Sequence, residues 1–282
     1  MRAVSTEELK ELCTRFPRAF GAPLSVRVLR VVLLALAAAY ILYLVNKLGF
    51  ISETFIAGWA KLGGTLAKMW PPSFHDSQSA HDIPIGIVET VAMAFLGSVF
   101  AGLIAIPLGF LGARTVVGNP VLHFLIRRVF DFFRGIPPLI WALIFTRAVG
   151  LGPMTGVLAF IASDFAALAK LNAEAIETVD AKPIEGVRSA GAGGFAVMRF
   201  GLLPQILPVM LGQTLYFFES DVRAAAILGI VGAGGIGRIL DQSMRLLYWS
   251  EVGMIILLFL ITVALIDFGS RWLRQRLIGS AS

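Results

Sequence analysis

The stretch FESDVRAAAILGIVGAGGIG, residues 218–237, places three charged side chains ahead of an apolar run and a cluster of glycines. Gly232, Gly234 and Gly237 match the GxGxxG dinucleotide-binding pattern. Glu251 follows close to where that fold expects an acid that binds a ribose. The sequence around this stretch decides between a nucleotide site and a membrane protein.

The composition is far more apolar than that of a water-soluble domain. Hydrophobic residues make up 57% of the 282 residues and charged residues 15%, and the mean hydropathy is +0.82. Soluble domains have about 45–50% and about 25%. The single cysteine, Cys13, excludes a disulfide framework and an iron–sulfur cluster. Composition therefore predicts an all-α integral membrane protein.

Apolar segments at six places in the chain predict about six transmembrane helices. They lie at residues 31–45, 83–113, 135–146, 149–169, 202–237 and 252–266. With the N-terminus in the cytoplasm, seventeen of the 24 lysines and arginines fall in inside segments and five in outside segments. This asymmetry predicts cytoplasmic N- and C-termini. It also accounts for the net charge of +6 without a nucleic-acid partner.

The glycines do not sit in the context that a dinucleotide site needs. They lie between two membrane-length apolar runs, and Glu251 comes directly before the last of these runs. We therefore expect Gly232, Gly234 and Gly235 to form a re-entrant turn that lines or gates a transport path. A plain connection between two spans is the alternative.

The polar segment at 170–203 contains a second pattern. Glu185 is followed by Gly191 six residues later and then by Leu203-Pro204. This resembles the EAA loop of binding-protein-dependent ABC importer permeases, in which a helix follows the glycine and ends in Leu-Pro. The sequence departs from the usual residues of that loop at Val187 and Gly201.

Several longer stretches resemble the phosphonate-transport permease family, whose relatives serve phosphite and hypophosphite. They are RGIPPLIWALIF (134–145), PIEGVRSAGA (183–192), FESDVRAAAILGIVGAGGIG (218–237) and LIDFGSRWLR (265–274). The resemblance implies the type I, methionine-permease-like fold of an importer in the bacterial inner membrane. It also implies a homodimer, two cytoplasmic ATPase subunits and a periplasmic binding protein that delivers the phosphonate or phosphite.

The apolar segments and charges, together with a resemblance that covers about residues 84–275, divide the chain into five expected parts. They are a cytoplasmic amphipathic segment (1–25), a first transmembrane helix (26–48), a periplasmic segment (49–82), a permease core (83–275) with a coupling loop at 174–203, and a cytoplasmic tail (276–282). The residues expected to contact the ATPase are Glu185, Gly186, Arg188, Gly191 and Ala192.

The expected function is passage of a phosphorus oxyanion by alternating access, driven by a partner. The sequence has no GxxxxGK[ST] P-loop, so we expect ATP and Mg²⁺ on the ATPase, no cofactor on this chain and no enzymatic activity of its own. A permease of the same fold for methionine is one alternative. A membrane oxidoreductase that uses the GxGxxG stretch is another.

Charged residues inside the apolar segments are further candidates for the translocation path. Glu219 and Arg223 are spaced to pair on one helix face, or Arg223 lines the path of an anion. Asp221 needs another partner or water. Asp164 is expected to pair with Arg147 or Lys170, or to face water.

Two short motifs complete the candidate set. His75, Asp76, His81 and Asp82 could bind a metal, contact the binding protein or form an ordinary solvated loop. The prolines at 137–138 predict a kink at the start of the third span.

Overall fold

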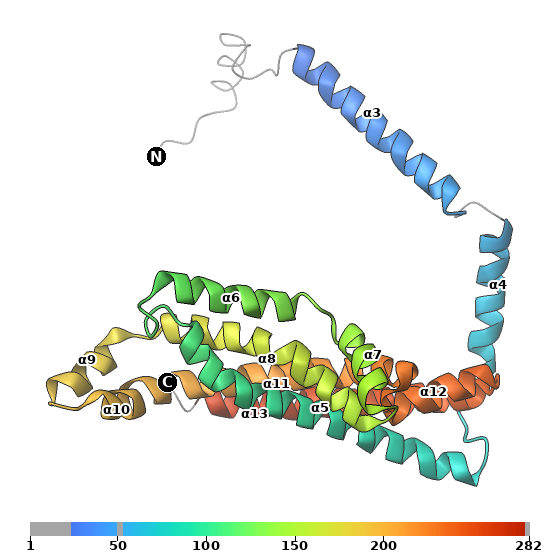
Figure 1. Cartoon of the computed structure of the whole chain (residues 1–282). Helices are drawn as coiled ribbons and strands as arrows, with labels where there is room; N and C mark the ends of the chain where they lie inside the picture. Colours follow the sequence, from blue (N-terminus) through green and yellow to red (C-terminus); the bar gives the residue numbers. More distant parts are fainter. Residues whose placement is uncertain (1–23, 50–52, 280–282) are drawn as a thin grey trace, which may run out of the picture. The chain divides into compact units, whose positions relative to one another are not determined.

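Figure 1 shows a computed structural model of the protein, described for residues 24–49 and 53–279. Every regular element in those ranges is a helix. The amphipathic helix predicted near the N-terminus falls almost wholly on residues 1–23, outside the described part. The chain divides into two compact units at residues 67 and 68, which we describe separately.

The described residues of the first unit form two helices, α3 (Leu24–Lys47) and α4 (Glu53–Lys68), of which α4 ends one residue into the second unit. Residues Val26–Lys47 of α3 are long and apolar enough to cross a membrane, and the unit buries none of them. Exposed leucines and valines on all sides are expected of a helix whose surroundings are lipid. The helix covers almost the same residues as the predicted first span.

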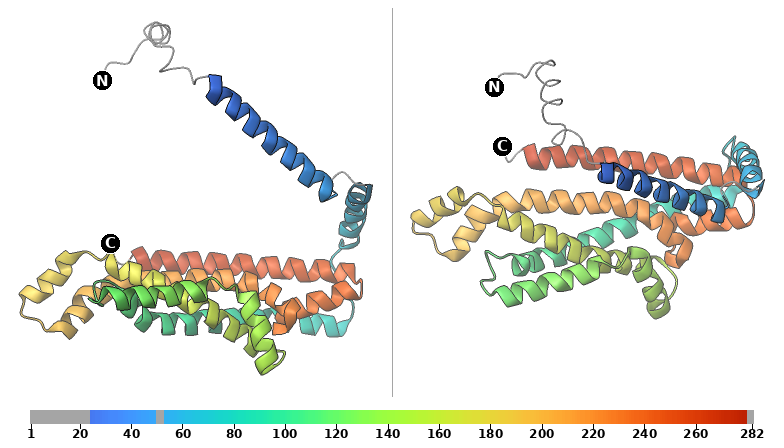
Figure 2. Two further views of the ribbon diagram at one scale, coloured as in Figure 1. Left: turned by 45° about the horizontal axis from the view of Figure 1, so that its top comes forward. Right: turned by 90° about the horizontal axis from the view of Figure 1, so that it is seen from above.

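The second unit is a bundle of helices that run side by side (Figures 1 and 2). α5 packs along α8, and α11 packs on both; α6 lies against α8, and α13 lies against α11. Their bounds are α5 (Ser77–Gly112), α6 (Pro120–Arg134), α8 (Pro153–Glu177), α11 (Leu203–Leu228) and α13 (Trp249–Gly279).

Short elements close the bundle at its two ends. One end carries α9 (Ala181–Ser189), α10 (Gly194–Ala196) and the π-helix η1 (Val197–Leu202). The opposite end carries α7 (Pro138–Val149), the π-helix η2 (Gly229–Ala233) and α12 (Gly235–Arg245). We call these the α9 end and the α12 end; Figure 1 shows them on opposite sides of the bundle.

Small residues let α5 and α8 approach closely. A Cβ on Gly97 would lie 2.5 Å from the Cβ of Phe160, and a Cβ on Gly109 would lie 2.6 Å from the Cβ of Asn172. Without a hydrophobic driving force between helices in lipid, such backbone proximity supplies much of the association through van der Waals contact. The α5–α8 pair is therefore the centre of the bundle.

The third span differs from its prediction. The sequence predicted a span that begins at residue 135, but the helix α6 precedes it and is bent from α7 by 80°. Asn119 caps α6 by accepting hydrogen bonds from the N–H groups of Val121 and Leu122, and Pro120 takes the first helical position. The charged residues of α6 kept this stretch out of the predicted apolar spans. The kink at 135–138 is where the prolines predicted it.

Two charged residues of α6 form ion pairs with α8, and these pairs attach α6 to the bundle. Arg127 contacts Glu177 at 3.0 Å, and Asp131 of α6 contacts Lys170 at 2.7 Å. With α6 and α7 counted as one bent span, the described residues contain six candidate membrane spans by length and composition. The protein is thus a multi-pass membrane protein, as the sequence predicted.

Candidate functional site

The glycine stretch forms a sharp turn at the α12 end. α11 continues into η2, and the chain then reverses into α12. Gly232, Gly234 and Gly235 have φ angles of +106°, +85° and +65°, which lie in the left-handed region that other residues rarely adopt. The predicted turn is therefore present, and these glycines are required by its backbone.

Two side chains of α5 cap the first turn of α12. The backbone N–H of Gly235 donates to Glu89 Oε2 at 2.9 Å, and that of Ile236 donates to Thr90 Oγ1 at 2.8 Å. A carboxylate at a helix N-terminus satisfies otherwise unpaired N–H groups and interacts favourably with the helix dipole. Glu89 thus ties the glycine turn to α5.

The same contact argues against the dinucleotide interpretation. A pyrophosphate would need the N–H groups at the start of this helix, where the negatively charged Glu89 already lies. No strand precedes the glycines, because the segment before them is α11. Glu251 accepts hydrogen bonds from Ser79 (3.0 Å) and Ser243 (2.8 Å), so its two oxygens join helices of this bundle.

Backbone segments meet at the turn with almost no space between them. A Cβ on Gly229 would lie 2.5 Å from the Gly234 carbonyl oxygen, and one on Gly237 would overlap the Ala226 carbonyl. The turn also touches the connection between α7 and α8, since the N–H of Gly152 donates to the Gly232 carbonyl at 3.0 Å. Movement of η2 and α12 would therefore disturb α5, α7 and α8 together.

The segment at the α9 end is exposed. Asp180 begins α9 by accepting the N–H of Lys182, and Gly191 follows the helix with a φ of +81°. Glu185, Gly186 and Arg188 are all exposed, and α9 contains no buried residue. Ala192 is half-buried. This exposed surface is where a partner could bind.

The structure shows what surrounds Gly201 and Val187, the two residues that depart from the EAA pattern. A Cβ on Gly201 would lie 3.1 Å from the Cα of Ile184, so the glycine lets η1 pack under α9. Val187 is half-buried on α9. Leu203-Pro204 begin α11 and do not end a helix, which corrects the expectation taken from the loop pattern.

The charged residues of α11 pair with other helices. The predicted Glu219–Arg223 pair is wrong: Glu219 pairs with Arg274 and Arg223 pairs with Asp267 at 3.0 Å, both on α13. Glu219 is buried, whereas the Arg223 side chain is 47% exposed. Of these two, only Arg223 presents its charge at the surface of the bundle.

The predicted partners of Asp164 are also wrong. Lys170 pairs with Asp131 of α6, and Asp164 instead lies against Ser163 and Asp221. Asp164 and Asp221 are 5% and 4% exposed, so neither side chain lines an open path in this structure.

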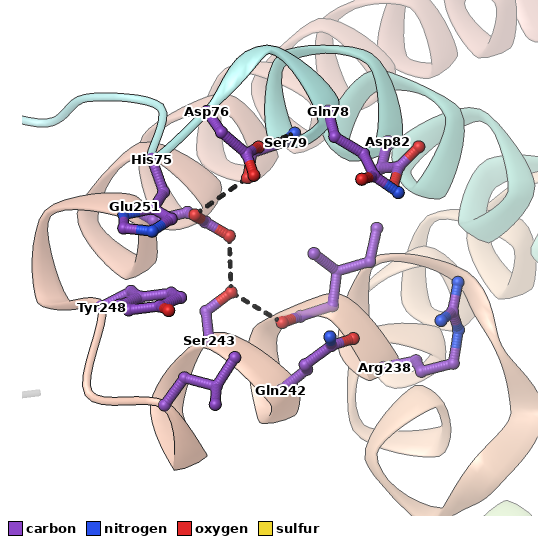
Figure 3. A pocket seen from close by; sticks show the side chains of 12 residues that line it. His75, Asp76, Gln78, Ser79, Asp82, Arg238, Gln242, Ser243, Tyr248 and Glu251 are labelled. Carbon is purple, nitrogen blue, oxygen red and sulfur yellow. Dashed lines mark hydrogen bonds between the residues drawn. The ribbon is translucent and has the colours of Figure 1, made fainter.

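A polar pocket of about 310 Å³ opens at the α12 end, between α5, α12 and α13 (Figure 3). Its walls carry Asp76, Asp82 and Glu251 together with the cation Arg238. Asp76 caps α5, and the hydrogen bond from the backbone N–H of Ser79 holds the pKa of its carboxyl below the usual value. Acidic side chains outnumber Arg238 here, so the pocket favours a positively charged group.

Metal binding was one of three interpretations of the His75/His81 loop, and the histidines are not arranged as a metal site. His75 stacks on the ring of Tyr248 with centroids 3.8 Å apart, and His81 lies beside Asp82 at 3.4 Å. Across residues 24–49 and 53–279, no group of three or more His, Cys, Asp or Glu side chains could hold a metal ion.

Comparison with known proteins identifies the fold and the family. Residues 105–279 match the binding-protein-dependent transport system inner membrane component family. The chain belongs to this family. It is therefore a permease subunit of the inner membrane and not itself an enzyme.

Several similar proteins are named for the transport of phosphorus compounds, and two of them are described here. The permease is 36% identical over 241 residues to the phosphate-import permease protein PhnE of Mycolicibacterium smegmatis, covering 86% of this chain and 44% of that protein. It thus spans less than half of that relative's length. It is 34% identical over 224 residues to the phosphite transport system permease protein PtxC of Stutzerimonas stutzeri, covering 79% of this chain and 80% of that protein.

Methionine permeases share the fold. The D-methionine transport system permease protein MetI of Escherichia coli is 29% identical over 160 residues, covering 53% of this chain and 71% of that protein. A solved inward-facing structure of the MetNI methionine ABC transporter matches with a TM-score of 0.63 at 26% identity, over 72% of this chain and 99% of that chain. The permease therefore has the type I, methionine-permease-like fold that the sequence predicted.

Proposed function

We propose that this permease carries a phosphorus oxyanion, phosphonate or phosphite, across the inner membrane as part of an ABC importer. The observation that supports this substrate class is the difference in similarity. Relatives named for phosphate or phosphite import are 36% and 34% identical over most of the chain, whereas the methionine permease of Escherichia coli is 29% identical over about half of it.

Energy would come from a pair of ATPase subunits at the α9 end. Glu185 and Arg188 project from a helix without buried residues, so both can enter the groove of a partner without unfolding the permease. ATP and Mg²⁺ would be bound by the ATPase. Closure of the ATPase pair would displace α9, and the helices attached to it would switch the path from one side of the membrane to the other.

A second copy of the permease would complete the path, and a binding protein would deliver substrate at the α12 end. The acidic pocket around Asp76 and Asp82 supports docking of a lysine or arginine from that protein. It is a poor receptor for the oxyanion itself, because like charges would repel it. The substrate would pass elsewhere, with Arg223 and the glycine turn as candidate path residues.

Growth and uptake with defined phosphorus sources test the substrate. The permease is produced together with a candidate ATPase and a candidate binding protein from the same organism, in a host that lacks its own phosphonate and phosphite importers. We expect growth on phosphite or a phosphonate and uptake that excess methionine does not reduce. Uptake of methionine in place of every phosphorus oxyanion would overturn the proposal.

Copurification tests the coupling surface. Glu185→Ala should reduce the amount of ATPase that copurifies with the permease, because it removes the exposed anion of α9. Asp241→Ala is the matched control: it removes an exposed ion pair with Arg245 at the opposite end of the bundle and should leave the ATPase bound. Equal ATPase recovery with both variants would contradict a role for α9.

A further inference from the structure

Two buried carboxyl groups face each other where α8 packs on α11. Asp164 of α8 is 5% exposed and Asp221 of α11 is 4% exposed. α8 and α11 pack against each other, and within this contact each carboxyl group acts on the other. Oδ2 of each residue is buried and receives no hydrogen bond from any donor in the described residues.

No cation of the packed helices is directed at this pair. Lys170 of α8 pairs with Asp131, and Arg223 of α11 pairs with Asp267. The other charges on neighbouring helices are also engaged: Glu219 of α11 with Arg274 of α13, and Glu89 of α5 with the N-terminus of α12. The ion pairs among the described residues include none between Arg147 of α7 and either aspartate.

Two ionised carboxylates in contact would be strongly unfavourable here. Like charges that share a site cannot both ionise readily, and a single unpaired charge within a membrane-spanning bundle is already unfavourable. A proton held between the two groups removes the repulsion and supplies the missing hydrogen-bond donor.

Ser163 shows which of the two groups is the acceptor. Its hydroxyl lies 2.6 Å from Asp164 Oδ1, the shorter of its two acceptor contacts, so Asp164 receives a donor. Asp221 receives no hydrogen bond from a side chain or backbone donor among the described residues. We propose that Asp221 carries a proton and donates it to the Asp164 carboxylate, forming a hydrogen bond that ties α11 to α8.

The position of the bond gives it a mechanical role, a consequence that rests on the proposed function. α8 leads into the α9 segment and α11 leads out of it. A bond between the two helices within the bundle makes them move together when a partner displaces α9. The other end of α11 continues into the glycine turn, so the pair helps transmit that displacement across the membrane.

Infrared spectroscopy of the permease in lipid tests the proton directly. Near neutral pH we expect the carbonyl band of a protonated carboxylic acid that shifts in deuterated water. It should be lost in Asp221→Asn, whose amide can donate to Asp164 in place of the acid. It should persist in Asp267→Asn, a matched control in which the aspartate is paired with Arg223. Absence of the band from the wild-type protein, or its persistence in Asp221→Asn, would overturn the proposal.

Coupling measurements test the bond. Asp221→Asn should change uptake per ATP hydrolysed less than about twofold, because it preserves a donor to the carboxylate. Asp221→Ala removes that donor and should lower the same ratio by about tenfold. Equal loss in both variants would overturn the donor role. A wild-type complex that imports no phosphorus oxyanion but retains the infrared band would contradict only the proposed function.

Discussion

At the scale of single residues, the glycine turn depends on missing side chains. A Cβ on Gly237 would overlap the Ala226 carbonyl and lie 2.9 Å from the Gly229 Cα. Because backbone atoms cannot rotate away as a side chain can, Gly237→Ala should lower the free energy of unfolding by about 1–3 kcal/mol. The thermal unfolding midpoint of the purified permease in lipid measures this effect.

Gly212→Ala is the matched control for that substitution. Gly212 is also buried, but a Cβ there meets no neighbouring atom within 4 Å. Alanine is favoured over glycine inside a helix by about 1 kcal/mol, so this variant should be as stable as the wild type or slightly more stable. Equal unfolding midpoints for the Gly212 and Gly237 variants would show that close packing at the turn does not limit stability.

Glu89 gives a second prediction at this scale. Glu89→Ala removes the acceptor for the Gly235 N–H and should weaken the start of α12 by about 1 kcal/mol, whereas Glu89→Gln keeps an oxygen that can accept this bond. Hydrogen exchange of peptides that cover η2 and α12 should therefore become faster in the alanine variant than in the glutamine variant. Unchanged exchange in both would mean that Glu89 does not hold the turn.

At the scale of helices, two ion pairs join α11 to α13 and should differ in strength. Glu219 is buried against Arg274, so Arg274→Gln leaves an unpaired buried charge at a cost of about 3–5 kcal/mol. Arg223 and Asp267 are 47% and 33% exposed, and Arg223→Gln should cost at most about 1 kcal/mol. Thermal unfolding of both variants provides the comparison, and a reversed order would show that burial does not govern these pairs.

Arg223 can then be tested for a role in transport. Since its ion pair contributes little to stability, Arg223→Ala should leave the amount of assembled complex nearly unchanged. If the exposed guanidinium eases an anion along the path, uptake should fall severalfold more than assembly. A parallel loss of uptake and assembly would limit Arg223 to a structural role.

The helices themselves were largely predictable from the sequence, because a lipid-facing span must be long and apolar. α3, α5, α8 and α13 satisfy that rule. α6 was missed since four charges occupy its fifteen residues, and two of them, Arg127 and Asp131, have partners on α8 that are 50 and 39 positions away in the chain. The kink at 135–138 was predictable, because proline restricts the preceding backbone locally.

Among the site residues, features that depend on local backbone geometry could be predicted from the sequence, and features that depend on contacts between distant residues could not. The turn at Gly232, Gly234 and Gly235 could be predicted, since its backbone geometry depends on the glycines themselves. The cap from Glu89 could not, because it joins residues 146 positions apart. The i,i+4 spacing of Glu219 and Arg223 favoured a local pair, but partners on α13 compete more strongly in the folded bundle.

At the scale of the whole molecule, α5, α8 and α11 connect the exposed α9 segment with the glycine turn. The small residues of α5 fix it against α8, and Glu89 joins α5 to α12. A displacement at one end therefore reaches the other end through packed helices and a few buried polar contacts. This arrangement suits a subunit that receives work on one side of a membrane and opens a path on the other.

The orientation of the bundle in the membrane is the last prediction. The α9 end carries Lys182, Arg188 and Arg199, and the positive-inside rule therefore places it in the cytoplasm. α5 has 36 residues, and at about 1.5 Å per residue it is long enough to carry its N-terminus beyond the opposite surface of the membrane.

Labelling of single cysteines tests this orientation in a Cys13→Ser background. The exposed position Ser77, changed by Ser77→Cys, should react with a membrane-impermeant maleimide in intact spheroplasts. A cysteine at exposed Ser189 should react only in inverted vesicles. The opposite pattern would place the acidic pocket in the cytoplasm and rule out an external binding protein as its partner.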